Sequence, residues 1–123
     1  MDSGKLSIID GSVKITPVNG TVWLTKHEIA DLFGCFVSKV GSNISVILKA
    51  GLLDESEVCR RKYYENGSFI EFYNLGMITA VAFRIRSHNA DLFRRWLMKQ
   101  AVQKQSDKWV SVFVPWSDKI FLN

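Results

Sequence analysis

The sequence predicts an α+β fold, and three features of the chain support this prediction. Residues 25–49 have the apolar spacing of two short helices that meet at Gly34. Residues 58–73 form a predicted β-hairpin, and two C-terminal helices follow it at 75–86 and 89–105. Helix, helix and hairpin in this order are typical of a winged-helix-like helix-turn-helix with a β-hairpin wing. We expect this arrangement to be preceded by an N-terminal β-meander.

The size and composition are those of one ordinary globular domain, which we expect to cover 1–123. The chain has 123 residues, of which 47% are hydrophobic and 23% are charged. Its two cysteines have no metal-ligand spacing, which favours a reducing compartment. No basic stretch followed by an apolar run opens the chain, and the longest apolar run, Met77 to Phe83, is too short to cross a bilayer. These features predict a cytoplasmic protein.

Two turn signals predict the N-terminal meander. Asp10-Gly11 and Asn19-Gly20 each stand between β-prone runs. Such pairs suit two-residue hairpin turns, because both central positions of those turns need a positive φ. The strands that they join would lead into Trp23 and Leu24.

The helix-turn-helix is predicted over 25–49. Thr25 can cap the first helix, and Gly34 ends it, because a tight corner needs the left-handed conformation. Ala30 is small where the two helices would cross. The apolar positions of the two helices recur at helical spacing: Ile29, Leu32 and Phe33 in the first, and Val37, Val40, Ile44, Ile47 and Leu48 in the second. The alternative is an ordinary helical corner inside another kind of core.

The outward side of the second helix carries candidate DNA-contacting residues. With the apolar stripe turned inward, this side presents polar and cationic side chains: Ser38, Lys39, Ser42, Asn43 and Lys49. Asn and Ser can hydrogen-bond base edges, and Lys pairs with phosphate or with guanine acceptors. The set lacks arginine, so a purely architectural helix is the alternative.

The wing hairpin is predicted over 58–73, with an Asn66-Gly67 turn at its tip. Its first strand carries a basic run, Arg60, Arg61 and Lys62, which a winged helix would bring near the DNA backbone. Strand alternation places Arg60 and Lys62 on one face and Arg61 on the other, so all three cannot serve at once. The alternative is a solvated edge strand protected by charge. The acidic stretch 54–57 before it is expected to be a loop.

The last part of the chain supplies the buried centre and a possible contact with a second copy. Asn74 can cap an apolar helix over 75–86, and Ser87 or Asn89 can cap the next helix over 89–105. Met98 and Val102 form a small second apolar strip that faces either a partner subunit or another part of the chain. A strand is predicted over 109–115, which pairs with the meander or is exchanged in a homodimer.

Charge is distributed unevenly. Residues 1–59 hold 5 Lys and Arg against 7 Asp and Glu, a net charge of −2, whereas residues 60–123 hold 11 against 5, a net charge of +6. The helix-turn-helix therefore lies in the acidic half. If the chain binds a polyanion, the later half must supply much of the attraction.

Catalytic motifs are missing from the sequence. His27 and His88 are far apart, and neither has a nucleophile at an informative spacing. The sequence has no phosphate-binding glycine loop, no paired-carboxylate signature and no metal spacing. We expect a protein that is not an enzyme and that needs no cofactor, metal or small-molecule ligand.

Over roughly 21–102 the chain resembles the RhuM-type virulence-protein family. The matching motifs are, in order, Val22-Trp23-Leu24-Thr25, Ile29-Ala30-Asp31-Leu32-Phe33-Gly34, Val40 with Ile44, Val58-Cys59, Phe72-Tyr73-Asn74-Leu75, Ile78, Phe83-Arg84-Ile85, Ser87, Phe93-Arg94 and Trp96. The ending Phe93-Arg94-Arg95-Trp96 is also similar to the amino-terminal domains of Bro-type phage antirepressors. The chain departs from the RhuM pattern at Cys35-Phe36-Val37, where charged and hydroxyl residues are usual. The resemblance implies a DNA-binding protein of bacterial or mobile-element origin.

Two functions follow from these observations. The first is binding of double-stranded DNA, as a homodimer, by a transcriptional regulator or accessory factor. The second is a protein–protein interaction module that keeps the winged-helix fold without reading DNA; the acidic N-terminal half and the apolar start of the second helix favour it.

Overall fold

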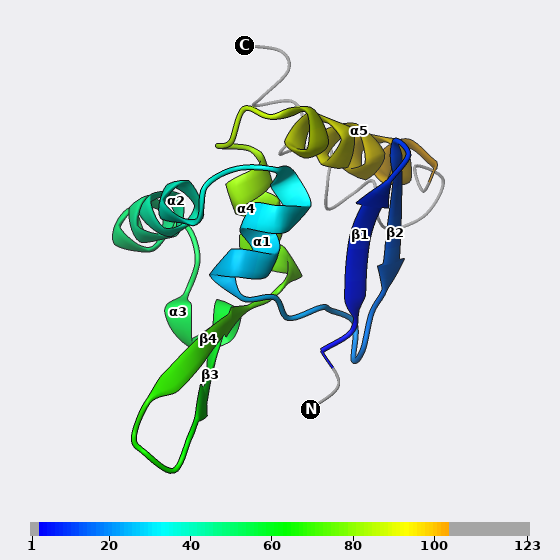
Figure 1. The fold of residues 1–123 in the computed structure, drawn as a ribbon. Helices are drawn as coiled ribbons and strands as arrows, with labels where there is room; N and C mark the ends of the chain where they lie inside the picture. Colours follow the sequence, from blue (N-terminus) through cyan, green and yellow to red (C-terminus); the bar gives the residue numbers. More distant parts are fainter. Residues whose placement is uncertain (1–2, 104–123) are drawn as a thin grey trace. The chain divides into compact units, whose positions relative to one another are not determined.

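The computed structural model describes residues 3–103, and within them the fold is mixed α and β (Figure 1). These residues form five helices and two separate two-stranded antiparallel sheets, which confirms the α+β prediction. The chain divides into two compact units, and the boundary between them falls between Phe93 and Arg94. The prediction of a single domain stays a prediction.

The first hairpin pairs β1 (Lys5–Ile9) with β2 (Ser12–Thr16). Its turn residues Asp10 and Gly11 have φ of 51° and 77°, as the two-residue turn requires. The first turn signal of the sequence is therefore confirmed.

The Asn19-Gly20 turn also forms, but the predicted meander is wrong beyond it. Asn19 and Gly20 have φ of 53° and 81°, yet they close only an isolated bridge between Val18 and Thr21. Pro17 stands just before that bridge and has no N–H to give a ladder. The chain then leaves the hairpin, and Leu24 makes an antiparallel bridge with Tyr73.

Helix α1 (Lys26–Phe33) begins at a complete capping box. The hydroxyl of Thr25 accepts a hydrogen bond from the Glu28 N–H at 3.1 Å, and the Glu28 carboxylate accepts one from the Thr25 N–H at 2.9 Å. The helix ends at Gly34, which has φ 65° and ψ 45°. The predicted cap and the predicted left-handed corner are both confirmed.

Helix α2 (Val37–Lys49) follows after three residues, and the α1–α2 pair is bent by 112° at the break. Val40, Ile44 and Ile47 are buried, which confirms the predicted inward stripe at these positions. Val37 and Leu48 are half-buried.

A short helix, α3 (Glu55–Val58), occupies the acidic stretch for which a loop was expected. Asp54 accepts a hydrogen bond from the Ser56 N–H at 3.0 Å and so caps this turn. Val58 at its end is buried. The cap and this one apolar anchor explain why four residues rich in charge are helical.

The second hairpin pairs β3 (Cys59–Tyr63) with β4 (Phe69–Tyr73), close to the predicted 58–73. Its tip differs from the two-residue turn expected, because Tyr64 and Ser68 still share a hydrogen bond and only Gly67 has a positive φ, at 87°. Asn66 is held by its side chain, which accepts hydrogen bonds from the N–H and the hydroxyl of Ser68 at 3.0 and 2.6 Å.

Helix α4 (Leu75–Ala82) is capped by Asn74, as predicted, but it ends four residues before the expected 86. The Arg84 N–H bonds to Val81 O at 2.9 Å, a tightened last turn that buries Ile85 and leaves Phe83 exposed. Apolar periodicity could not place this end because Ile85 continues the pattern. Helix α5 (His88–Gln103) then begins, with the Ser87 hydroxyl accepting from the Ala90 N–H at 3.0 Å.

The core of the first unit is apolar throughout. Phe33 and Phe93 are fully buried and meet edge to face, with ring centroids 5.6 Å apart and an interplanar angle of 65°. Met77, Ile78 and Val81 of α4 are also fully buried, in agreement with α4 as the buried centre.

The predicted strand over 109–115 and the last two residues of the predicted helix 89–105 lie outside the described residues. Within residues 3–103 no single helix is long and apolar enough to cross a membrane, although the bent α1–α2 pair meets that test by length and composition alone.

Candidate nucleic-acid interface

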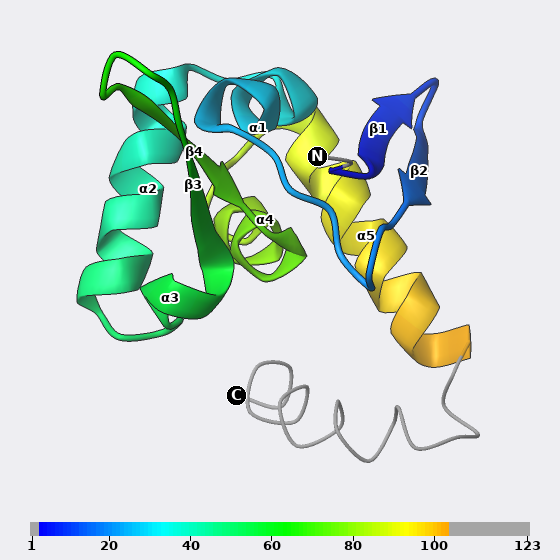
Figure 2. The ribbon, with the colours of Figure 1, turned by 90° about the horizontal axis from the view of Figure 1, so that it is seen from below.

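The two predicted DNA-contacting elements, α2 and the β3–β4 hairpin, lie on the same side of the first unit in both views (Figures 1 and 2). Lys26, the first residue of α1, connects them. Its Cδ lies 4.0 Å from the position that a Cβ on Gly41 of α2 would take, and its Nζ lies 4.0 Å from the Glu71 carboxylate of β4. A Cβ at position 41 would therefore be in ordinary van der Waals contact with the Lys26 stem, which lies against α2.

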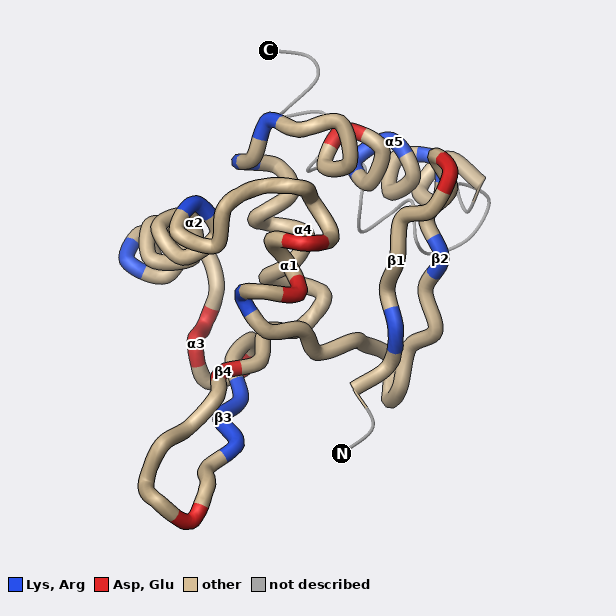
Figure 3. Tube along the Cα trace, in the orientation of Figure 1, with Lys and Arg blue, Asp and Glu red and all other residues tan. Residues whose placement is uncertain are grey.

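The outward side of α2 is exposed and has no acidic residue. Ser38, Lys39, Ser42 and Lys49 are exposed and Asn43 is half-buried, and Val37–Lys49 contains no Asp or Glu. All five residues predicted from the sequence therefore lie on one accessible helix. Figure 3 shows Lys positions on α2 and a basic run on β3, with an acidic position at the hairpin tip.

Two of these five side chains each donate a hydrogen bond within the protein. The Ser42 hydroxyl donates to Ser38 O at 2.8 Å, and the Asn43 amide donates to Lys39 O at 2.9 Å. The Asn43 oxygen accepts a hydrogen bond from Arg84 Nε at 2.9 Å. On these two residues, the Ser42 oxygen as an acceptor and one Asn43 N–H remain for a ligand.

Arg84 is not among the DNA-contacting residues predicted from the sequence. It lies just after α4, and its partner is Asn43, 41 residues earlier in the chain. The bond brings a guanidinium to the side of α2. No local pattern could indicate this pairing, because it depends on how α4 ends and on the 112° bend before α2.

Large apolar side chains are also exposed on α2 and just before it. Phe36, which precedes α2, is 83% exposed, and Val46 is 44% exposed. Phe36 holds α2 only through its backbone: its carbonyl accepts from the N–H groups of Lys39 and Val40, and its side chain makes no cap.

The basic run of β3 is divided between the two faces of the hairpin, as strand alternation predicted. The Arg60 guanidinium lies 4.3 Å from the Trp23 ring centroid. Arg61, on the other face, donates from Nε to the Glu71 carboxylate at 3.2 Å and lies 4.7 Å from the Phe69 ring centroid. Lys62 lies 5.7 Å from the Tyr64 ring centroid. Stacking on rings leaves these cations exposed at the hairpin surface.

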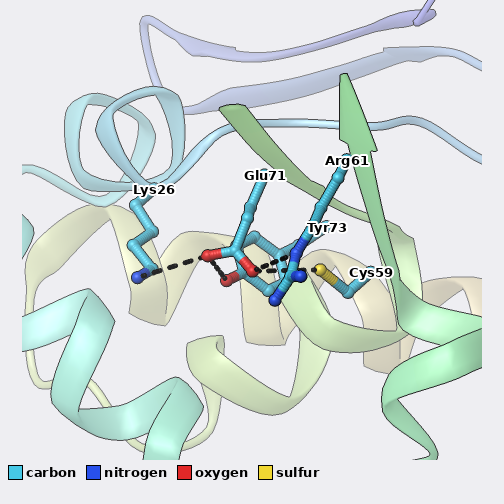
Figure 4. Close-up of polar contacts among 5 residues, drawn as sticks. All are labelled: Lys26, Cys59, Arg61, Glu71 and Tyr73. Carbon is cyan, nitrogen blue, oxygen red and sulfur yellow. Dashed lines mark hydrogen bonds and ion pairs between the residues drawn. The ribbon is translucent and has the colours of Figure 1, made fainter. Parts of the chain in front are cut away.

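Glu71 is the centre of a polar cluster at the base of the hairpin (Figure 4). Its carboxylate accepts from Arg61 and from the Tyr73 hydroxyl at 3.3 Å, the Cys59 thiol lies 3.7 Å away, and Lys26 forms a 4.0 Å ion pair. Burial raises the pKa of Tyr73 well above its ordinary value of 10.0, and the Glu71 charge raises it further. Burial and Glu71 likewise raise the pKa of Cys59 above 9.0. Both groups are therefore held neutral.

The distal half of the hairpin exposes apolar and aromatic side chains. Tyr63 is 63% exposed, and its ring packs against Phe69 with centroids 5.5 Å apart. Tyr64 and Ile70 are exposed beside them, and Glu65 at the tip adds a negative charge. The sequence could have predicted this exposure. Its β-prone residues alternate between the two faces of the hairpin, and a hairpin that projects from its domain cannot bury both faces.

The remaining titratable groups of residues 3–103 include no group of three or more His, Cys, Asp or Glu that could hold a metal ion. Burial raises the pKa of the Cys35 thiol, and Lys39 offsets part of this effect, so the thiol beside α2 is kept protonated.

No protein-family model matches the chain, and it has no significant match among curated proteins or among solved structures. The resemblance to RhuM-type proteins stays a prediction.

Proposed function

We propose that this chain binds double-stranded DNA, with α1 and α2 as a helix-turn-helix and the β3–β4 hairpin as its wing. The observation on which this rests is the outward side of α2, which is exposed, contains Lys39 and Lys49, and has no acidic residue. The acids of the N-terminal half lie elsewhere, for example at Asp54 and Glu55. The α1–α2 angle of 112° lies in the range of helix-turn-helix motifs, in which the exposed second helix enters the major groove.

The wing cations support the same proposal. Lys62 is exposed on one face of the hairpin, and Arg61 is exposed on the other despite its ion pair with Glu71. Their role would be to position the protein on phosphates, which carries no sequence information. The biological role that fits is a transcriptional regulator or accessory factor of bacterial or mobile-element origin, as the RhuM resemblance implies.

A homodimer is part of this proposal. Two copies would place two α2 helices about 34 Å apart, one turn of DNA. The exposed Val102 side chain, 61% accessible on α5, belongs to the apolar strip suggested for the dimer contact. Light scattering checks this part: a monomer at high concentration contradicts it.

The alternative is a protein-interaction module, and one observation favours it. The Asn43 amide, the best base-reading group on α2, is engaged by Lys39 O and Arg84. A module that lost DNA reading could use its polar side chains in this way. DNA binding and binding of a protein partner differ sharply in how the affinity depends on salt.

The test is fluorescence anisotropy with a labelled random duplex, titrated with salt. DNA binding predicts roughly micromolar affinity that falls steeply with salt. Lys39→Ala with Lys49→Ala should reduce the slope of log K against log salt by about 2, because about 0.9 counterion is released for each phosphate contact. The control removes two exposed lysines from the first hairpin, Lys5→Ala with Lys14→Ala. Absence of binding at low salt, or equal losses in both double variants, would overturn the proposal.

A further inference from the structure

The exposed apolar residues next to α2 lie in line with its cation. Phe36, Lys39, Asn43 and Val46 follow one another at intervals of three, four and three residues, the spacing of one line along a helix. Phe36 is 83% exposed and Val46 is 44% exposed. Phe36 is the most exposed of the large hydrophobic side chains in the described part of the chain. An aromatic ring left so open to water is informative, because burial of a Phe side chain is strongly favourable.

Two of the polar groups on the same helix have little left to offer a base edge. The Ser42 hydroxyl and one Asn43 N–H donate to backbone carbonyls of α2, and the Asn43 oxygen accepts from Arg84. The exposed apolar groups of α2 are therefore candidates for base discrimination beside Ser38 and the two lysines.

The charge of this helix identifies the kind of surface that would cover those apolar groups. Lys39 and Lys49 are exposed, α2 has no acid, and the Arg84 guanidinium lies beside Asn43. A neutral apolar partner would leave these cations unpaired, whereas a polyanion would pair them. Ser38, Ser42 and Ser45 are small and exposed, so the backbone of α2 can come close to that surface.

The major groove of DNA combines a polyanionic backbone with one apolar group, the methyl of thymine. We propose that Phe36 and Val46 contact thymine methyl groups, so that α2 selects duplexes with thymine at the positions it covers. This inference rests on the proposed DNA binding and adds its base preference.

The test compares an alternating A·T duplex with the same duplex in which uracil replaces thymine, which removes only the methyl groups. Anisotropy at low salt should give wild-type protein a preference for the thymine duplex of roughly fourfold for each methyl contacted. Phe36→Ala should lose most of this preference and keep its salt dependence. Leu52→Ala, at a residue 65% exposed beyond the end of α2, is the matched control and should keep the preference. Because Phe36 is exposed, its variant should melt at the temperature of the wild type.

The test distinguishes failure of the methyl contact from failure of DNA binding. Equal wild-type affinity for the two duplexes overturns the methyl contact and leaves DNA binding standing. A wild-type preference that Phe36→Ala retains in full also overturns it, because the preference would then come from duplex shape. No binding to either duplex overturns both proposals.

Discussion

The Arg84 guanidinium donates from Nε to the Asn43 side-chain oxygen at 2.9 Å, across 41 residues of sequence. The bond fixes an amide on the exposed side of α2 and connects that helix to the end of α4. One residue is therefore both a candidate for contact with DNA and a structural partner of another element. Variants at this position can separate the two roles.

Asn43→Asp should retain the fold and weaken DNA binding. The new carboxylate can still accept from Arg84 but cannot donate to Lys39 O, so the free energy of unfolding should fall by about 1 kcal/mol. The same charge would repel phosphates, and we expect a loss of roughly fivefold in affinity at low salt. Anisotropy and urea unfolding on one preparation measure both quantities. Asn43→Ala is the uncharged control and should lose less affinity; unchanged binding by Asn43→Asp would contradict α2 as the DNA-contacting helix.

Thr25→Ala should destabilise the protein by about 1 kcal/mol, because it removes the acceptor for the Glu28 N–H. Thr25→Ser keeps the hydroxyl and should cost a few tenths of that. Urea unfolding followed by circular dichroism checks the pair. If serine were as costly as alanine, the loss would come from the methyl group of Thr25 and the capping box would contribute little.

Gly34→Ala should cost about 1 kcal/mol through backbone strain alone. Gly34 has φ 65°, and a Cβ built there meets no atom within 4 Å, so crowding adds nothing. Gly34→Asn should cost less, because asparagine tolerates the left-handed region better than alanine. Equal losses for the two variants in thermal melts would indicate a cause other than φ.

Stability should fall at alkaline pH because of Tyr73. Its pKa is raised in the folded protein above the ordinary 10.0, so the folded state resists loss of the proton. The stabilisation is complete below the ordinary pKa and is lost as pH rises through that value toward the raised one. Tyr73→Phe should flatten this decline in urea unfolding under reducing conditions. Identical pH profiles for wild type and variant would show that Tyr73 ionises as freely in the folded protein as in the unfolded one.

Local signals in the sequence were sufficient for the elements that depend on neighbouring residues. The Thr25 cap, the Gly34 corner and the buried positions Val40, Ile44 and Ile47 follow from caps, turn chemistry and periodicity. Reasoning from local signals was wrong where tertiary contacts determine the position or the end of an element. The third meander strand is replaced by the Leu24–Tyr73 bridge, and α4 ends early to bury Ile85.

The candidate site was predictable as a list of residues but not as an arrangement. Alternation correctly divided Arg60 from Arg61, but their partners Trp23 and Glu71 come from elements whose positions only the fold defines. The Arg84–Asn43 bond could not be predicted for the same reason.

An NMR titration can test directly whether α2 and the wing form a DNA-contacting surface. Amide shifts of ¹⁵N-labelled protein would be followed as an A·T-rich duplex is added at low salt. We expect perturbations concentrated in Phe36–Lys49 and in β3, with β1 and β2 unaffected. No perturbation, or changes centred on the β1–β2 hairpin with α2 silent, would contradict it.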